Sequence, residues 1–391
     1  MNNKNLKIIG LLVYLAAAGI SYFLFSGNSS VVGTLPGTSP VSLKPKGDND
    51  YQAITFDPNA PKTEECPING AMYGKDQKAW WEKHRPLGVM IENHSEARPQ
   101  SGINSADVTY EAVAEGGITR TLNIFYCQDA GIVGPVRSAR TYFLDFVSEY
   151  GDNPLYAHVG GANTPGPADA LGQINDYGWG GYNDMNQFSI GFPTYYRDQT
   201  RLGHDAATEH TMYSVTNKLW DIGASRKLTN LDKDGKTWDT NFVKYTFKDD
   251  ESAAKRPASQ SINLEFWNDP DYFVDWIYSP KENIYLRKNG GVPHIDRDTK
   301  KQLSAHNIVV LFMSERHAND GYEGNAHLLY GTKGSGQALF FMDGKEIKGT
   351  WKKKDRESRT ILTDNAGNEI KFNRGKIWFE IEALDATVTV K

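Results

Sequence analysis

Four arginines lie close together in this 391-residue chain. The surrounding sequence places them on predicted loops or at the ends of predicted strands and helices. They are Arg98, Arg120, Arg137 and Arg140, and they belong to the clusters ARPQSG (97–102), EGGITR (115–120) and GPVRSAR (134–140). A guanidinium group presents forked donors that match a carboxylate or a phosphate. The sequence therefore predicts an anion clamp, with a purely structural salt-bridge network as the alternative.

Arg137 and Arg140 stand at or just before the start of a predicted helix, where the helix dipole disfavours a cation by about 0.3–1 kcal/mol. A negative group is expected to offset this cost. The internal candidates share one face of a predicted strand, because strand side chains alternate with period two: Asp107, Glu111 and Glu115. The external candidate is an anionic ligand, such as a carboxylate, a phosphate or an envelope polymer that carries either.

His158 ends a predicted strand beside Gly160 and Gly161. It is either a ligand contact or general base, or a structural histidine held by hydrogen bonds. A catalytic alternative uses Glu111 or Glu115 with His158 as acid and base. Glu111 and Glu115 are about 13 Å apart along a strand, too far for the ~5–9.5 Å of a glycosidase pair. Either glutamate would need a partner from another element.

Other chemistries find little support, and the sequence predicts no metal and no cofactor. His204 and His210 are six residues apart, unlike the i, i+4 histidines of a helical zinc motif. The SxxK match at 252–255 lies in a charged loop without its partner motifs. The chain carries 43 basic and 48 acidic residues and no long basic stripe, so nucleic acid is not an expected partner.

The elements that must position these residues predict an α+β fold. Strand patterns cover 87–93, 107–115, 119–127 and 155–159, and helical patterns cover 76–83, 139–150 and 207–222. The glycine pair 116–117 predicts a hairpin. From about residue 241 onward, short alternating runs are separated by turns. We expect a mixed α/β domain at 66–240 and a predominantly antiparallel β domain at 241–391, with the boundary between 226 and 260.

The N-terminal region predicts a membrane anchor. Residues 8–25 form an uncharged apolar run long enough for a single transmembrane helix. The positive-inside rule leaves residues 1–7 in the cytoplasm and the domains outside the cell membrane; a cleaved signal peptide is the alternative. Residues 26–65 have the composition of a flexible linker.

Two further features bear on location and ligand. Cys66 and Cys127 are the two cysteines of the chain, and outside the cell a disulfide between them is expected, with two buried thiols as the alternative. Residues 178–198 combine aromatic residues with glycines and could offer a sugar-stacking surface, although burial is an equal alternative.

Several motifs together resemble the DUF3048 family. They are Arg85-Pro86 before a strand, the three arginine clusters, and the downstream GSG, DG, GTWKK and GKIW. The resemblance runs from Arg85 to about Ala383 and covers the family's N-terminal and C-terminal domains. It implies an extracytoplasmic, membrane-attached bacterial protein and no particular reaction. This chain differs from lipoprotein members by its apolar N-terminal helix in place of a lipidated cysteine.

The leading hypothesis is a membrane-anchored extracytoplasmic protein that binds an anionic or glycan ligand of the cell envelope. The residues expected to bind it are Arg98, Arg120, Arg137, Arg140 and His158. A hydrolase or transferase acting on cell-wall polymers, through Glu111, Glu115 and His158, is one alternative. A structural module that binds a protein partner is the other.

Overall fold

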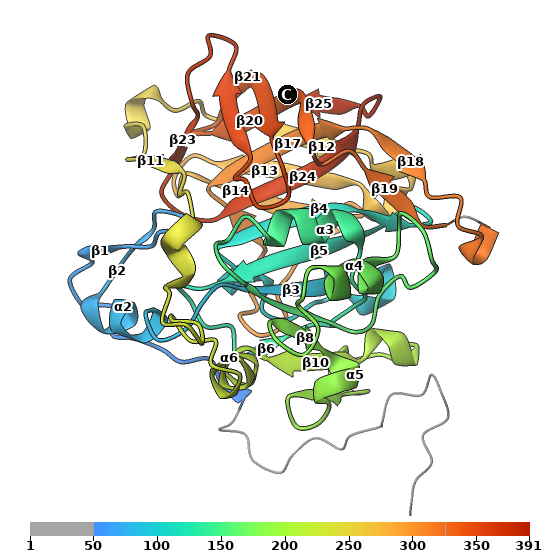
Figure 1. Cartoon of the computed structure of the whole chain (residues 1–391). Helices are drawn as coiled ribbons and strands as arrows, with labels where there is room; N and C mark the ends of the chain where they lie inside the picture. The colour runs from blue at the N-terminus through green and yellow to red at the C-terminus, as the bar shows by residue number, and fades with distance from the viewer. Residues whose placement is uncertain (1–50, 325) are drawn as a thin grey trace, which may run out of the picture. The chain divides into compact units, whose positions relative to one another are not determined.

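A ten-stranded mixed sheet runs through the computed structural model, which describes residues 51–324 and 326–391 (Figure 1). Its order is β22 (Ile361–Asp364), β21 (Lys345–Lys353), β20 (Gly334–Met342), β17 (Asn307–Met313), β24 (Ile377–Ala383), β4 (Val108–Glu115), β5 (Ile118–Phe125), β3 (Leu87–Glu92), β7 (Leu155–His158) and β8 (Asp184–Asn186). Strand β24 pairs in parallel with both β17 and β4. The sheet is therefore continuous between the N-terminal and C-terminal parts of the chain.

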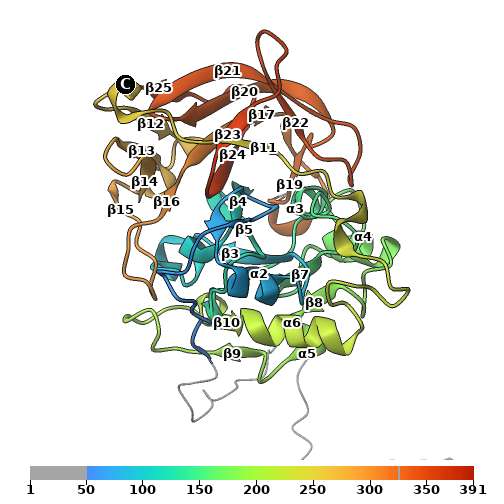
Figure 2. The ribbon, with the colours of Figure 1, turned by 90° about the vertical axis from the view of Figure 1, so that its left-hand side faces the viewer.

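A second sheet comes from the C-terminal part alone (Figure 2). It contains β15 (Val292–Pro293), β14 (Ile284–Asn289), β13 (Val274–Ser279), β12 (Ser261–Leu264) and β25 (Val388–Val390), and β16 (Ser304–Ala305) also pairs with β14. Period-two alternation buries Val274, Trp276 and Tyr278 on one face of β13. The Trp276 ring meets that of Trp378 on β24, with 5.1 Å between their centroids. This contact joins the two sheets.

Helices and small sheets complete the described residues. The helices are α2 (Lys75–Trp81), α3 (Thr141–Val147), α4 (Ala170–Asp176), α5 (Gln187–Ile190) and α6 (Thr216–Ser225). The small sheets are β1 (Glu64–Glu65) with β2 (Met72–Tyr73), β6 (Ile132–Val133) with β10 (Met212–Val215) and β9 (Tyr195–Arg197), β11 (Thr246–Lys248) with β23 (Lys371–Asn373), and β18 (Glu315–His317) with β19 (Leu328–Tyr330). The chain thus has a sheet-rich α+β fold.

One hydrophobic core combines residues from both parts of the chain. The rings of Tyr110 on β4 and Phe379 on β24 stack with 4.5 Å between centroids. All seven residues of α3 are buried, so this helix has no solvent-exposed face and its stability comes from packing. The division at residues 240 and 241 stays a prediction, and the described residues lie within one compact unit.

Most of the predicted elements are present, and one was wrong. The four N-terminal strands and the helices at 76–83 and 139–150 correspond to β3, β4, β5, β7, α2 and α3. The predicted helix 207–222 begins only at Thr216, because residues 212–215 form β10 between β6 and β9. Strand pairing buries Tyr213 and Val215, and this tertiary gain overrides the helical pattern. The C-terminal part is largely antiparallel, but β17–β24 and β11–β23 are parallel pairs.

The β4–β5 hairpin forms as predicted but contains a β-bulge. Gly116 and Gly117 have φ of 58° and 82°, which suits a turn that needs left-handed residues. The register shifts between Val113 and Glu115, and an extra residue in one strand reverses which face the next side chain takes. The expectation that Glu111 and Glu115 share a face was therefore wrong.

Residues before the first strand contact the folded part. The Tyr51 ring packs edge-on against Tyr196 at 5.0 Å between centroids, and the Ile54 N–H donates to Asp129. The final residues of the predicted linker 26–65 are thus docked. In the ranges 51–324 and 326–391, no helix has the length and apolar character to cross a bilayer. The predicted anchor at 8–25 lies outside the described residues.

Candidate ligand-binding site

Arg137 is held in an extended segment between the end of β3 and the loop after β7. Its N–H donates to the carbonyl of Met90 at 3.0 Å, and its carbonyl accepts the N–H of Val159 at 3.0 Å. Two residues later, the Ala139 N–H donates to Gly160. Backbone hydrogen bonds on both sides therefore fix the position of the Arg137 side chain.

Glu92, the last residue of β3, divides its two oxygens between Arg137 and His210. Its Oε1 accepts from Arg137 Nε at 3.1 Å, and its Oε2 lies 2.8 Å from His210 Nδ1. Burial opposes ionisation of Glu92, but the His210 hydrogen bond and the charges of Arg137 and Arg120 outweigh it and lower its pKa. The bond to Glu92 also raises the pKa of His210.

The terminal nitrogens of Arg137 have no hydrogen-bond or ion-pair partner in residues 51–324 and 326–391; Glu92 meets Nε alone. The Arg137 side chain is 27% exposed. Arg197 on β9 is close enough for the charge of Arg137 to contribute, after burial, to lowering the pKa of Arg197. Arg197 NH1 donates to the carbonyl of Thr208 and to Thr211 Oγ1. Two like charges thus lie near each other, and only one of them contacts a carboxylate.

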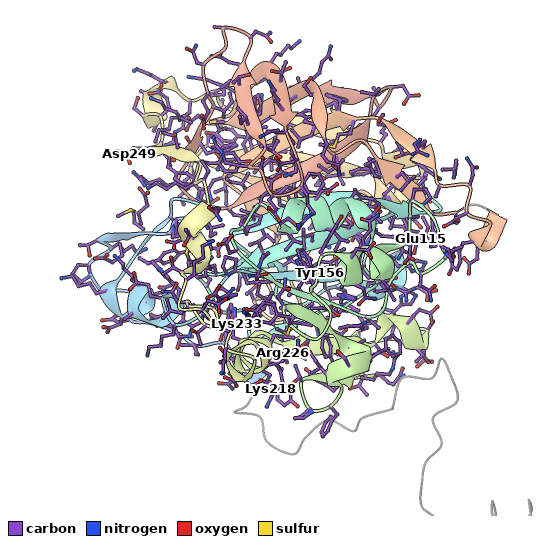
Figure 3. All side chains as sticks on the ribbon, viewed as in Figure 1. Glu115, Tyr156, Lys218, Arg226, Lys233 and Asp249 are labelled. Atoms are coloured by element: carbon purple, nitrogen blue, oxygen red, sulfur yellow. A yellow bond between two sulfur atoms is a disulfide. The ribbon has the colours of Figure 1, made fainter. Side chains whose placement is uncertain are left out.

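Arg120 and Arg140 share one glutamate, Glu115. Glu115 lies at the end of β4 and is labelled in Figure 3. Arg120 NH2 is 2.8 Å from Oε1, and Arg140 NH2 is 2.6 Å from Oε2. Burial would raise the pKa of Glu115, but the two guanidinium groups hold it well below its usual range. Arg140 is the residue before α3, so Glu115 is the negative group that offsets its position at the helix start.

Arg98 contacts backbone carbonyls rather than a carboxylate. Its NH1 donates to the carbonyl of Asp271 at 2.9 Å, and its NH2 donates to the carbonyl of Asn93 at 3.0 Å. The guanidinium carbon also lies 5.2 Å from the centre of the Tyr272 ring, in cation–π geometry. Burial, together with the charge of Arg287, lowers the pKa of Arg98 to about 10. Arg98 is thus apart from the other three arginines in its contacts and links the two sheets.

Glu111 faces the second sheet and pairs with Arg287 on β14. Arg287 NH2 reaches both carboxylate oxygens, at 2.8 and 2.6 Å, and both side chains are fully buried. Thr119 and Asn93 also donate to Glu111. Glu380 lies beside Glu111 in the strand register, and Trp276 donates to it at 2.7 Å. Glu111 therefore serves the contact between the sheets.

His158 is fully buried, and both its ring nitrogens are occupied. Nδ1 lies 2.6 Å from the carbonyl of Gly160, and Nε2 lies 2.6 Å from Asp184 Oδ1 on β8. The catalytic arrangement of His158 with Glu111 or Glu115 requires a hydrogen bond, direct or through one water. Arginines hold both glutamates, and Asp184 holds the histidine, so these contacts organise the fold.

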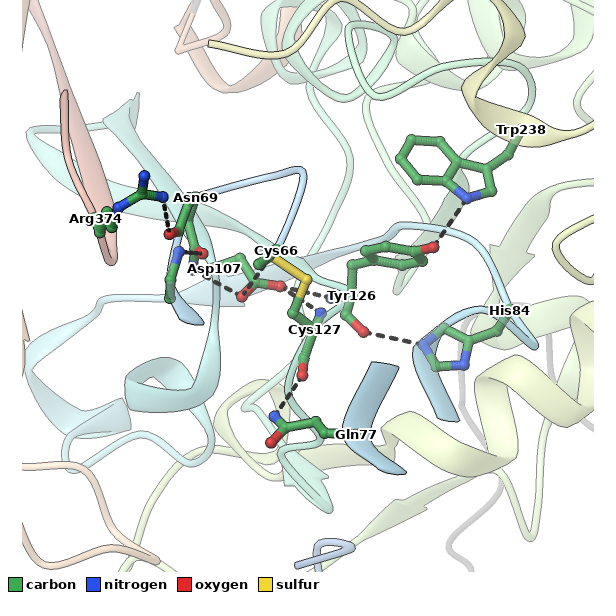
Figure 4. The surroundings of a disulfide bond; sticks show 11 residues. Cys66, Asn69, Gln77, His84, Asp107, Tyr126, Cys127, Trp238 and Arg374 are labelled. Atoms are coloured by element: carbon green, nitrogen blue, oxygen red, sulfur yellow. Dashed lines mark hydrogen bonds between the residues drawn. A yellow bond between two sulfur atoms is a disulfide. The ribbon is translucent and has the colours of Figure 1, made fainter. Parts of the chain in front are cut away.

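Cys66 and Cys127 form a disulfide bond, with 6.0 Å between their Cα atoms (Figure 4). Asp107 lies beside it, and its Oδ2 accepts the backbone N–H groups of Tyr126 and Cys127 at 2.8 Å each. Asn69 donates to the other oxygen at 2.9 Å. Burial raises the pKa of Asp107 to about 7, although these N–H donors oppose the shift. Asp107 thus fastens the disulfide segment and is no partner of the arginine cluster.

Among the described residues, the structure brings together a set of potential metal-ligating groups that the sequence did not single out as a set. The ligand atoms of His94, Glu96 and His210 lie within 4.8 Å of one another. His94 Nδ1 already accepts the N–H of Glu96, and His210 Nδ1 faces Glu92. A metal ion would use the other histidine nitrogens and the Glu96 carboxylate. His204, by contrast, only contacts the carbonyl of Asp205.

Four further residues complete the contacts of the predicted site residues: Glu92, Arg197, His210 and Arg287. The sequence pointed to none of them as part of this site; His210 was considered only as a metal ligand. Glu92 is the easiest of the four to predict. It ends a clear strand pattern and comes shortly before the first arginine cluster, at 97–102. The other three come from segments far along the chain, and no local pattern marks them.

Comparison with known proteins defines the class to which this α+β fold belongs. Residues 73–229 match the family described as "Protein of unknown function (DUF3048) N-terminal domain", and residues 262–379 match the corresponding C-terminal domain. The chain is 30% identical over 328 residues to "Putative lipoprotein YerB" of Bacillus subtilis strain 168, covering 83% of this chain and 88% of that protein. The crystal structure of the YerB protein from Bacillus subtilis is similar, with a TM-score of 0.67 and 25% identity over 84% of this chain and 100% of the YerB chain.

This protein belongs to the DUF3048 family. The resemblance inferred from the arginine clusters and the downstream motifs is thereby confirmed, and it includes both domains of the family.

Proposed function

We propose that this protein is a membrane-anchored extracytoplasmic protein that binds an anionic ligand through Arg137. One observation carries the proposal: Glu92 holds Arg137 only through Nε, which leaves its two terminal nitrogens without a partner among the described residues. These nitrogens form one side of the guanidinium fork, which can donate two parallel hydrogen bonds to a carboxylate or a phosphate. The ordered backbone on both sides of Arg137 means that little conformational entropy is lost on binding.

The charges around Arg137 also favour an anion. Arg120, Arg137, Arg140 and Arg197 carry four positive charges, whereas the acids that contact them, Glu92 and Glu115, carry two negative charges. The difference is two positive charges, counted with His210 neutral. Arg120 and Arg140 contribute to the electrostatic potential and position Glu115. We therefore narrow the predicted clamp to Arg137, with Arg197 beside it.

An exposed aromatic side chain beside the loop that holds the Arg137 backbone supports a ligand that also carries sugar rings. Phe188 on α5 is 59% exposed, and its ring lies 3.0 Å from the position that a Cβ on Gly160 would occupy. Gly160 follows Val159, whose N–H donates to the Arg137 carbonyl. Exposed aromatic rings stack on the apolar faces of sugars. An anionic glycan of the cell envelope is consistent with both features.

Three observations support the location. The disulfide between Cys66 and Cys127 suits an oxidising compartment outside the cytoplasm. The similar protein from Bacillus subtilis bears the name lipoprotein, and residues 8–25 have the length and composition of a membrane-spanning helix. We propose that residues 8–25 anchor this chain, in place of a lipid, as a single-pass segment.

Binding of simple anionic polymers tests the proposal. The purified full-length chain in detergent is titrated with sodium polyphosphate, with poly-glutamate and with uncharged dextran, and the heat of binding is measured. We expect binding of at least one anionic polymer that weakens as salt is raised. Arg137→Ala should weaken it by about 10- to 100-fold, since a hydrogen bond to a charged group is worth about 1.5–3 kcal/mol.

Arg316→Ala is the control, because Arg316 is an exposed arginine on strand β18 and contacts neither Glu92 nor Arg137. It should bind as the unmodified chain does. Equal losses in Arg137→Ala and Arg316→Ala would reduce the effect to net charge and remove Arg137 from the site. Undiminished binding in Arg137→Ala, with the fold intact, would contradict the proposal directly.

A further inference from the structure

A pocket of about 270 Å³ lies where the ends of the two sheets approach each other. Four acids and one tryptophan are among its lining residues: Glu265, Glu315, Glu382, Asp385 and Trp267. They come from the segment after β12, from β18, from the end of β24, and from the loop between β24 and β25. None of the residues that line the pocket belongs to the proposed anion site around Arg137.

None of the described residues that line the pocket is basic. The remaining residues that line the pocket are Val113, Ala383, Ala386 and Thr387. None of the four acids forms an ion pair with a described residue, in contrast to the glutamates of the arginine cluster. Glu315 has only neutral donors, the indole N–H of Trp267 at 2.8 Å and the hydroxyl of Tyr330. The pocket is therefore lined by acids that have no paired cation among the described residues.

Glu382 distinguishes this pocket from an ordinary acidic surface. Its side chain is 3% exposed, and its Oε1 is buried without a hydrogen-bond partner among the described residues. Buried carboxyl oxygens are nearly always hydrogen-bonded, and an orphaned one requires an explanation. Burial, and then the charges of Glu380, Glu111 and Glu315, raise the pKa of Glu382 well above its usual range. A cation in the pocket would supply both the missing partner and the missing charge.

Trp267 provides an aromatic wall. Its side chain is 40% exposed, and its Cβ rests against Gly117 of the β4–β5 turn. The residue has a φ of 48°, a conformation that is rare for a bulky side chain. The His317 ring meets the indole at 6.0 Å between centroids. A cation over the indole face would gain cation–π attraction.

The spread of the acids favours an organic cation over a metal ion. In residues 51–324 and 326–391, the sets of three ligand atoms that lie within 4.8 Å of one another include none of these four acids. A hard metal ion needs converging oxygen ligands at about 2–2.6 Å. The pocket has the volume of about nine water molecules at ~30 Å³ each, so it has room for a larger group.

We propose that this pocket binds the alkylammonium group of a primary amine, with Glu382 as its buried acceptor, Glu265, Glu315 and Asp385 around the charge, and Trp267 along the alkyl chain. A free diamine and a lysine-type side chain of a peptide share this chemistry. The pocket accepts either source of the ammonium group, and the test separates the two.

The test uses the full-length chain and four probes: 1,5-diaminopentane, Nα-acetyl-lysine methylamide, 1-pentanol and calcium chloride. Binding is followed by calorimetry and by the shift in Tm. We expect saturable binding of one or both amines, weakened by salt, and none of 1-pentanol. Tighter binding of the lysine derivative indicates a peptide ligand, and tighter binding of the diamine indicates a free amine.

Glu382→Gln keeps the shape of the side chain and removes its capacity to ionise beside a bound cation. No hydrogen bond or ion pair of Glu382 is broken, so the variant should fold, and amine binding should fall at least tenfold. Asp385→Asn, at an exposed position, should lower binding several-fold. Asp205→Asn removes an exposed acid on another segment and should have no effect.

Two outcomes would overturn the inference. One is calcium binding that matches or exceeds amine binding and is lost in Glu382→Gln, since that result defines a metal site. The other is unchanged amine binding in Glu382→Gln. The Arg137→Ala variant should bind amines normally, so failure of the anion proposal and failure of this inference are distinguishable.

Discussion

The arginine cluster and the acidic pocket both concentrate charge, but ion pairs within the chain form only in the first. Arg120, Arg137 and Arg140 each contact a glutamate within the chain. In the pocket, Glu265, Glu315, Glu382 and Asp385 have no ion-pair partner among the described residues. The contrast teaches that a cluster of charges in the sequence says little about whether a charge is available to a ligand.

The physical difference lies in which elements supply the partners. Arg120 on β5 stands opposite Glu92 on β3 and beside the bulged end of β4, so strand pairing itself brings opposite charges together. The pocket acids come from strand ends and a loop, where no ladder places a cation beside them. Charged side chains are thus most available to a ligand where the pairing of strands ends.

The largest expected effect comes from breaking the compensated region. Glu115→Ala leaves Arg120 and Arg140 buried without their shared acid, and loss of one partner of a buried pair costs about 3–5 kcal/mol. Because the Glu115 side chain is 24% exposed, we expect about 3 kcal/mol from urea unfolding. Asp385→Ala in the pocket should change the free energy of unfolding by less than about 0.5 kcal/mol. Equal costs for the two variants would erase the contrast.

The pH dependence of stability tests the raised pKa of Glu380, which lies beside Glu111 of the buried ion pair. Burial and the charge of Glu111 raise the pKa of Glu380 to about 8. The folded chain therefore keeps a proton that the unfolded chain releases above its ordinary pKa near 4.5, and stability falls as pH rises between these values. From pH 5 to 7 the loss is about 2–3 kcal/mol at ~1.4 kcal/mol per unit.

Glu380→Gln keeps the oxygen that accepts from Trp276 and should make this slope less steep in urea unfolding at pH 5, 6 and 7. A residual slope of the same sign is expected, because burial also raises the pKa values of Asp107 and Glu382. The window ends at pH 7 because Lys376, whose pKa burial lowers to about 7, contributes with the opposite sign above it. Parallel slopes for the two proteins would show that Glu380 ionises normally.

A smaller effect is expected from the shape of the Arg137 group. Arg137→Lys keeps the charge but replaces the planar fork by a point charge. Anion binding should weaken about five- to tenfold, as expected for loss of about 1 kcal/mol from one hydrogen bond. Calorimetry with the anionic polymers measures it. Wild-type affinity in Arg137→Lys would mean that charge alone attracts the ligand.

The smallest effect concerns the wall of the acidic pocket. Trp267→Phe keeps an aromatic face but removes the N–H that donates to Glu315. Cation–π attraction at exposed sites is worth about 0.5–1 kcal/mol and is stronger for tryptophan, so amine affinity should fall about two- to fivefold. An unchanged affinity in calorimetry would place the ligand away from the indole.

Local patterns carried much of the prediction. Period-two alternation located β3, β4, β5 and β7. The glycine pair located the hairpin turn between β4 and β5. The same logic failed at 207–222, where an apolar spacing compatible with a helix also suits β10 followed by α6. Local sequence cannot separate these outcomes, since the pairing of β10 with β6 and β9 involves residues far along the chain.

The sequence by itself determined the strand-rich organisation, the two cysteines that pair, the family, and the acids and arginines that could interact. Only the tertiary structure decided which charges meet. One extra residue at the β4 bulge moved Glu115 to Arg120 and Arg140, while Glu111 faced Arg287. The parallel insertion of β24 beside β4 placed Glu380 next to Glu111. Side-chain direction and strand order depend on pairing between segments that are far apart in the chain. A local sequence pattern therefore cannot predict them.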